Sequence, residues 1–230
     1  WGGFWAWDPV ENAALMPWLT GTAFLHSVMI QEKRNMLKIW NVVLIIMTFG
    51  LTIIGTFLTR SGIINSVHSF TQSEIGPAFL IYLTLILVTG FALLFKRIQM
   101  LESEHKIESV LCRENVFLAQ NVLLVGIAFT VLLGTTFPLL AEAVRGTKLS
   151  IQAPFFNTVT APMGYALLFL MGIGMLISWR KSNLEGLRRS FQNPIILATV
   201  GTIFLTWLLW EKNLRWDVYT TFWSAIFVTS

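Results

Sequence analysis

The sequence predicts an all-α membrane protein, a polytopic transmembrane helical bundle of about six spans plus a partial seventh. Of the 230 residues, 55% are hydrophobic and only 12% are charged, and the mean hydropathy is +0.67. Soluble domains carry about 25% charged residues, so a soluble chain this short could not bury so much apolar surface. The third observation is a series of apolar runs long enough to cross a bilayer.

Six runs approach the roughly 20 residues that a bilayer crossing needs, and they cover residues 11–30, 39–59, 76–95, 116–137, 158–178 and 194–210. Helices are expected because a helix satisfies its own backbone hydrogen bonds in lipid. A seventh run begins near residue 218 and is too short to cross. The chain begins without Met and ends inside this run, so we expect it to be a piece of a longer protein.

The lysines and arginines predict the orientation. Eleven of the sixteen lie in the loops 31–38, 96–115 and 179–193, and five lie on the other side. Cytoplasmic loops carry the excess of Lys and Arg, so these three loops are expected in the cytoplasm. The start of the chain and the loops 60–75 and 138–157 should then share the outer face.

The chain opens with WGGFWAWDPVEN, which contains a helix-start signal. Asp8 suits the N-cap, Pro9 suits the first helical turn, and Glu11 stands where a capping box requires it. We therefore expect the first span to begin here.

An aromatic cluster precedes this helix start, and two interpretations of it remain open. Tryptophan favours the membrane–water interface, where its ring is buried and its N–H is hydrated. An interfacial belt accounts well for the later tryptophans Trp18, Trp40, Trp179, Trp207, Trp210, Trp216 and Trp223. The glycines of the cluster, however, let the backbone bend and approach a ligand closely, so a platform for a flat apolar ligand is equally compatible. The cluster comprises Trp1, Gly2, Gly3, Phe4, Trp5 and Trp7.

The three histidines differ in their settings. His105 lies in a charged loop and is expected to be solvated. His26 lies inside the first span, where an ionisable residue is costly and indicates function; its small neighbours would leave room for a flat group, and a hydrogen bond to another helix is the alternative. His68 lies in the outer loop 60–75, where a neutral imidazole can ligate haem iron and Arg60 can pair with a propionate.

Several other chemistries find no support in the sequence. It contains no Walker loop, GxSxG or HExxH motif, and its spans contain almost no acids that would line an ion pathway. The positive charges do not gather on one soluble face, as nucleic-acid binding requires. Cys112 is the single cysteine, so it forms no internal disulfide and no CxxC pair; we expect an ordinary residue of a polar loop.

Taken together, the motifs resemble one family. WGGFWAWDPVENAALMPWL resembles the tryptophan-rich WWD signature of haem-handling membrane proteins. GTAFLHS, GTFLTRSGIINSVHSF and LGTTFPLLAEAVRGTKLSIQAPFFN resemble segments of the CcmF family of cytochrome c maturation proteins, strongly to about residue 160 and more weakly beyond it. This chain has Phe4 and Ala6 where many members have Trp and Phe, which implies a platform of altered shape.

The resemblance implies a haem lyase subunit, part of a holocytochrome c synthase complex with two b-type haems. The outer haem would lie on the WWD platform and be joined through its vinyl groups to the CxxCH thiols of apocytochrome c. The second would be buried in the membrane. His68 and His26 would be axial ligands of the outer and the buried iron, each opposite a ligand outside this chain. The platform would comprise Trp1, Gly2, Gly3, Phe4, Trp5, Trp7, Asp8 and Arg60, and no residue resembles a dedicated catalytic acid or base.

The implied partners are the haem chaperone CcmE, apocytochrome c, the thiol-handling subunit CcmH and the lipid bilayer, with no nucleic acid. The implied location is the bacterial inner (cytoplasmic) membrane with the WWD face toward the periplasm, or the mitochondrial inner membrane. Residues 1–75 would hold the WWD motif, two spans and the loop with His68, and residues 76–230 the further bundle. Two alternatives remain: a CcmC-type haem delivery protein, whose WWD stretch lies midway along its chain, and a transporter whose tryptophans form only a belt.

Overall fold

Helices make up the regular structure of the residues that the computed structural model describes, which are 4–60, 75–103, 112–146, 151–177, 179 and 184–208. The elements are α1 (Pro9–Arg34), α2 (Lys38–Arg60), α3 (Gly76–Lys96), the 3-10 turn η1 (Ile98–Leu101), α4 (Arg113–Arg145), α5 (Ala153–Leu176) and α6 (Leu184–Leu208). Two compact units are formed, Trp1–His105 with Leu124–Ala161, and Lys106–Leu123 with Pro162–Ser230. The predicted all-α class is confirmed.

The helices α1 to α5 are long and apolar enough to cross a membrane. They coincide with the first five predicted runs, although α4 continues through Pro138 to Arg145 and α5 begins already at Ala153. Most of the stretch 138–157, which was expected to be a loop, is therefore helical. Among the described helices α6 is not a candidate span; it includes residues 194–208 of the sixth run and begins earlier, at a charged turn with Glu185. The start of the seventh run lies outside the described residues.

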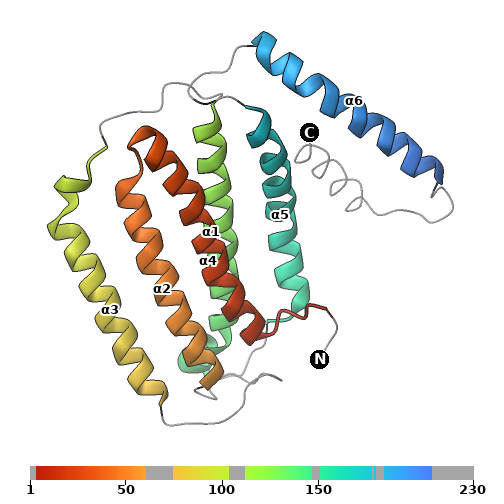
Figure 1. The fold of residues 1–230 in the computed structure, drawn as a ribbon. Coiled ribbons are helices and arrows are strands. Elements are labelled where there is room, and N and C mark those ends of the chain that lie inside the picture. The colour runs from red at the N-terminus through yellow and green to blue at the C-terminus, as the bar shows by residue number, and fades with distance from the viewer. Residues whose placement is uncertain are drawn as a thin grey trace. The chain divides into compact units, whose positions relative to one another are not determined.

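In the first unit, α2 packs against both α1 and α3 (Figure 1). A short connection through Asn35, whose backbone is left-handed with φ 53°, turns the chain back so that α1 and α2 are antiparallel. Glycines let the helices approach closely. A Cβ added at Gly55 would meet the carbonyl oxygen of Ala13 at 3.3 Å, and one at Gly90 would meet Ile46 at 3.2 Å. Small residues at helix contacts are typical of membrane bundles.

Two polar contacts also join α1 to α2. Near the connection, Asn41 Nδ2 donates to Gln31 Oε1 at 2.6 Å, and farther along the helices the Thr48 hydroxyl donates to Thr20 Oγ1 at 2.8 Å. In lipid such contacts contribute about 0.6–2 kcal/mol each. They satisfy side chains that would otherwise be costly in a membrane.

One end of the first unit gathers the start of α1, the end of α2 and the start of α3. Their shared apolar cluster consists of Ala13, Phe57 and Leu58, with Ile54 and Phe79 packed against it. Arg60 is the last residue of α2 and is exposed. It therefore lies at the same end of the bundle as the residues that precede α1.

The capping box predicted from DPVE is confirmed. The Asp8 carboxylate accepts a hydrogen bond from the N–H of Val10 at 3.0 Å. The Glu11 carboxylate accepts from the N–H of Asp8 at 3.2 Å and from that of Ala6 at 3.0 Å. The two acids thus hold the backbone ahead of the helix as well as its first turn.

Asp8→Ala is expected to lower the free energy of unfolding by about 1 kcal/mol, because the N-cap loses its acceptor. Thermal unfolding of the purified protein in detergent measures the change. Asp8→Asn keeps an acceptor oxygen and serves as the control, with a smaller loss. An Asp8→Ala protein as stable as the parent would contradict the capping role.

Candidate functional site

The described part of the aromatic cluster is residues 4–7, called here the aromatic strip, and its last ring is fastened to the start of α5. Trp7 stacks on Phe156, with ring centroids 5.0 Å apart and planes 12° from parallel. Its Nε1–H donates to Asn157 Oδ1 at 2.7 Å. Phe156 is only 2% exposed, and stacked aromatic pairs contribute about 0.5–1.5 kcal/mol beyond their burial. One face and the N–H of Trp7 are therefore already engaged.

The backbone of Trp7 is held as firmly as its ring. Its φ of 58° lies in the left-handed region, which bulky residues rarely adopt. Asn12, which is 1% exposed, donates from Nδ2 to the Trp7 carbonyl at 3.1 Å and to Thr135 Oγ1 of α4 at 3.0 Å. Such strained residues cost about 1–3 kcal/mol and cluster at functional sites. Asn12 supports this conformation from the first turn of α1.

Phe4 and Trp5 are the residues of the strip whose rings stay open. Phe4 is fully exposed and Trp5 is 40% exposed. Trp5 meets Trp7 edge to face, with centroids 5.7 Å apart and planes at 88°, so one side of Trp5 is supported while the rest is accessible. Within the described residues, these two rings can contact a flat ligand. Trp1, Gly2 and Gly3 of the predicted platform lie outside the described residues.

The predicted ligands of the outer site are only partly placed. Arg60 lies at the same end of the bundle as the strip, as described above. His68 and His105 lie outside the described residues, so their positions stay predictions. Asp8, also assigned to the platform, directs its carboxylate to the first turn of α1.

His26 lies far from the strip, about 25 Å along α1 from Pro9 at 1.5 Å per residue. Its side chain is half-buried. The small neighbours Ala23 and Ser27 are fully buried, so they serve helix packing; the room for a flat group beside the imidazole stays a prediction. A ligand on the strip cannot also reach His26, and any site here is a separate one.

The side of α1 next to His26 presents an apolar stripe. Its exposed members are Trp18, Leu25 and Met29, at 63%, 62% and 39% exposure. Their spacings of seven and four residues place them on one helix face. The helix that carries His26 therefore presents an exposed apolar face close to the imidazole.

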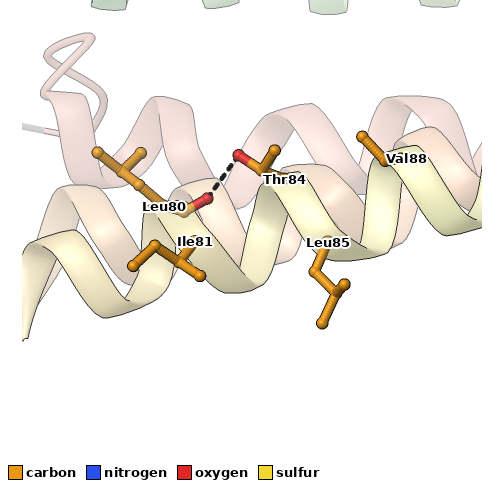
Figure 2. Close-up of a pocket in the computed structure, with 5 residues that line it drawn as sticks. All are labelled: Leu80, Ile81, Thr84, Leu85 and Val88. Carbon is orange, nitrogen blue, oxygen red and sulfur yellow. Dashed lines mark hydrogen bonds between the residues drawn. The ribbon is translucent and has the colours of Figure 1, made fainter.

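An apolar groove lies elsewhere, on α3, and Figure 2 shows its lining of Leu80, Ile81, Thr84, Leu85 and Val88. The Thr84 hydroxyl donates to the Leu80 carbonyl at 2.8 Å (dashed in Figure 2), so it is already engaged within its own helix. The remaining lining is aliphatic. Lipid chains match such a surface, and it forms no part of the candidate site.

In the second unit, Arg113 at the start of α4 closes the end of α5. Its Nε donates to the carbonyls of Gly174 at 2.9 Å and Ile177 at 3.0 Å, and its Nη2 donates to that of Met175 at 2.7 Å. The guanidinium also lies over the Trp179 ring, 5.4 Å from its centroid. Terminal helix carbonyls lack partners within their own helix, so Arg113 acts as a C-cap supplied by another helix.

Cys112, which precedes α4, is buried, with 1% of its surface exposed. It lies in the connection ahead of α4, as expected of a loop residue, but the polar sequence around it conceals its packing. Burial raises the pKa of its thiol, and the neighbouring Glu114 carboxylate adds to the rise. The thiol is accordingly protonated and slow to react near neutral pH.

Sequence reasoning missed Asn12, Phe156 and Asn157. All three stand inside the motifs that carry the resemblance, DPVEN and QAPFFN. Nothing in a linear pattern pairs these two motifs, and the contacts between them are what the folded chain adds.

The described helices include five that are long and apolar enough to cross a membrane, and the chain is similar to proteins of cytochrome c assembly. Residues 1–64 match the family described as "Cytochrome C assembly protein". The chain is 42% identical over 210 residues to the cytochrome c-type biogenesis protein ccl1 of Rhodobacter capsulatus, covering 91% of this chain and 32% of the relative. It is also 42% identical over 228 residues to CcmF of Pseudomonas aeruginosa, covering 96% of this chain and 34% of that protein.

A solved structure points the same way. "Cytochrome c Heme Lyase CcmF" superposes with a TM-score of 0.72 at 32% identity, covering 99% of this chain and 32% of that one. The chain thus spans about a third of the length of the curated relatives it matches. The resemblance to CcmF is confirmed.

Proposed function

We propose that this chain is part of a haem lyase subunit for cytochrome c biogenesis, and that its aromatic strip holds haem for attachment to apocytochrome c. The observation that carries the proposal is the exposed ring of Trp5, supported by a Trp7 that is itself held against Phe156, with the exposed ring of Phe4 beside it in the sequence. The similarity to cytochrome c-type biogenesis proteins supports it, and favours it over a CcmC-type delivery protein or a transporter.

The described residues fit haem as a substrate. The open rings of Phe4 and Trp5 suit the apolar porphyrin face, and the exposed guanidinium of Arg60 suits a propionate. Asp8 and Glu11 direct carboxylate oxygens to backbone N–H groups. The negative charges of these two carboxylates are therefore engaged in the cap of α1. By the family resemblance, His68 in the following loop would be the axial ligand.

The contribution of the chain is positioning. Thioether formation adds each cysteine S–H across a vinyl group of the substrate haem, so one C–S and one C–H bond form and no oxidant is consumed. Phe4 and Trp5 orient the ring and shield one face from water, and Trp7 keeps Trp5 in place. Holding reactants in register can contribute about 7–11 kcal/mol to such a step.

His26 would serve a second haem, of the b type, within the membrane. Its distance from the strip requires a separate site, and the stripe of Trp18, Leu25 and Met29 suits a flat apolar group. When bound, such a group supplies electron transfer. The second ligand of each iron would come from outside this chain.

The setting follows from the same proposal. The strip would face the periplasm from a bacterial inner membrane, or the corresponding side of the mitochondrial inner membrane, where CcmE, CcmH and apocytochrome c would meet it. The excess of Lys and Arg in the loops of the opposite side supports this orientation.

Haem spectra of the full-length protein test the function. His68→Ala is expected to lose the outer haem and His26→Ala the buried one, each with lower holocytochrome yield, because imidazole is the proposed axial ligand. His105→Ala is the control and should keep both. If His26→Ala and His68→Ala retained haem content and holocytochrome yield, the haem lyase proposal would be wrong.

A further inference from the structure

We infer that the first turn of α5 positions the aromatic strip, with Asn157 and Phe156 acting through Trp7. Phe4 and Trp5 then touch the ligand, and Trp7 is a positioning residue. This inference rests on the proposed function, because it concerns how the strip binds haem.

A continuous column of contacts, from α4 to Trp5, supports the strip. Its base is Gly134 of α4, where an added Cβ would lie only 2.5 Å from Cε1 and 2.7 Å from Cζ of Phe156. Any larger residue would occupy the space of that ring. Phe156 carries Trp7 by stacking, and Trp7 meets Trp5 edge to face. The column therefore runs from the backbone of α4 to an exposed ring.

Asn157 fixes the orientation of the Trp7 indole, which stacking on Phe156 alone does not determine. A stacked indole can still flip by about 180° about its Cβ–Cγ bond, because either face of the ring can stack on Phe156. The bond from Trp7 Nε1–H to Asn157 Oδ1, at 2.7 Å, selects one orientation. Asn12 independently fixes the Trp7 backbone. With ring and backbone both anchored, the plane against which Trp5 packs is set before a ligand arrives, and such preorganisation raises affinity.

The contacts that hold the Trp7 ring can be changed without changing the helix cap of α1. The backbone ahead of α1 is held by Asp8 and Glu11, which do not contact α5 through these bonds. Loss of the Asn157 acceptor should therefore loosen the rings of the strip and leave the start of α1 in place. The His26 site, about 25 Å away along α1, should be unaffected and gives an internal control.

The test is a haem titration of the full-length protein followed at the Soret band, with Asn157→Leu, Trp7→Phe and the double variant. Each single variant removes the same hydrogen bond, and each is expected to weaken the outer site about threefold to tenfold. The double variant should be no weaker than the worse single variant, because the two changes are coupled. Asn157→Asp keeps an oxygen acceptor and should restore most of the affinity.

The outcomes of the titration distinguish the positioning role of α5 from the proposed haem-binding function. Unchanged outer affinity in Asn157→Leu, or single effects that simply multiply in the double variant, would overturn the positioning role. A wild-type protein with no outer haem would overturn the proposed function instead. Trp7→Phe keeps the stacked ring, so if Asn157→Leu fails to fold, Trp7→Phe with unchanged outer affinity still refutes the role and a weakened site supports it.

Discussion

Gly134→Ala is expected to destabilise the protein by about 1–3 kcal/mol, the usual cost of overpacking, and to weaken the haem binding that is proposed for the strip. The new methyl group would lie 2.5 Å from the Phe156 ring, so that ring must move and Trp7 loses its base. Helix propensity alone predicts a gain in stability instead, since Ala is favoured over Gly by about 0.8–1.0 kcal/mol. Thermal unfolding and a haem titration measure the two effects.

Gly164→Ala is the matched control for that prediction. Gly164 also lies in a helix, α5, but an added Cβ there meets nothing within 4 Å, so the change should be neutral or stabilising. Combining Gly134→Ala with Phe156→Leu should recover part of the stability, because the smaller side chain can yield, while haem binding stays weak without the stack. Wild-type stability in Gly134→Ala would show that Phe156 is not confined as described.

Arg113→Met is expected to lower the free energy of unfolding by about 2–3 kcal/mol, because bonds from a charged donor to three carbonyls are lost. Arg113→Lys should lose less than Met but still be weakened, since an ammonium cannot reproduce the planar fork. The rate at which a maleimide labels Cys112 measures the effect locally, because that thiol is buried beside Arg113. We expect faster labelling in both variants.

The maleimide labelling of Cys112 is best carried out near pH 7. Burial raises the pKa of the Cys112 thiol in the folded state, so its contribution to stability is complete below the ordinary thiol pKa of about 8.5. It is lost as the pH rises through the folded value. Labelling near pH 7 therefore reports opening without weakening the fold. Arg188→Met, at an exposed position of α6, is the control, and equal rates in it and in Arg113→Met would contradict the capping role.

Most predictions that rest on residues close together in the sequence were confirmed. The capping box formed as DPVE indicates, because its donors and acceptors lie within a few residues of one another. The five candidate spans match because hydropathy is a sum over a short window. The predicted end of the fourth run at residue 137 was wrong, because α4 continues through Pro138 to Arg145. Nearby helices and side chains allow a proline within a membrane helix.

Predictions about individual side chains were less complete. The residues around His26 are small, as the sequence shows, but two of them are buried against the bundle. Cys112 stands among polar residues and is nevertheless buried. Burial depends on the neighbouring helices, which a single stretch of sequence does not specify.

The sequence by itself determined the helical membrane class, the start of α1 and the aromatic character of the strip, because each arises from composition or from contacts along a short length of chain. Only the tertiary structure decided which aromatic ring is braced and which is open. Trp7 meets an acceptor 150 positions away, and its backbone support reaches a threonine 123 positions from Asn12. Contacts of that separation form only when the helices pack, so they determine that Trp7 is held in place and supports Trp5, whose ring stays partly open.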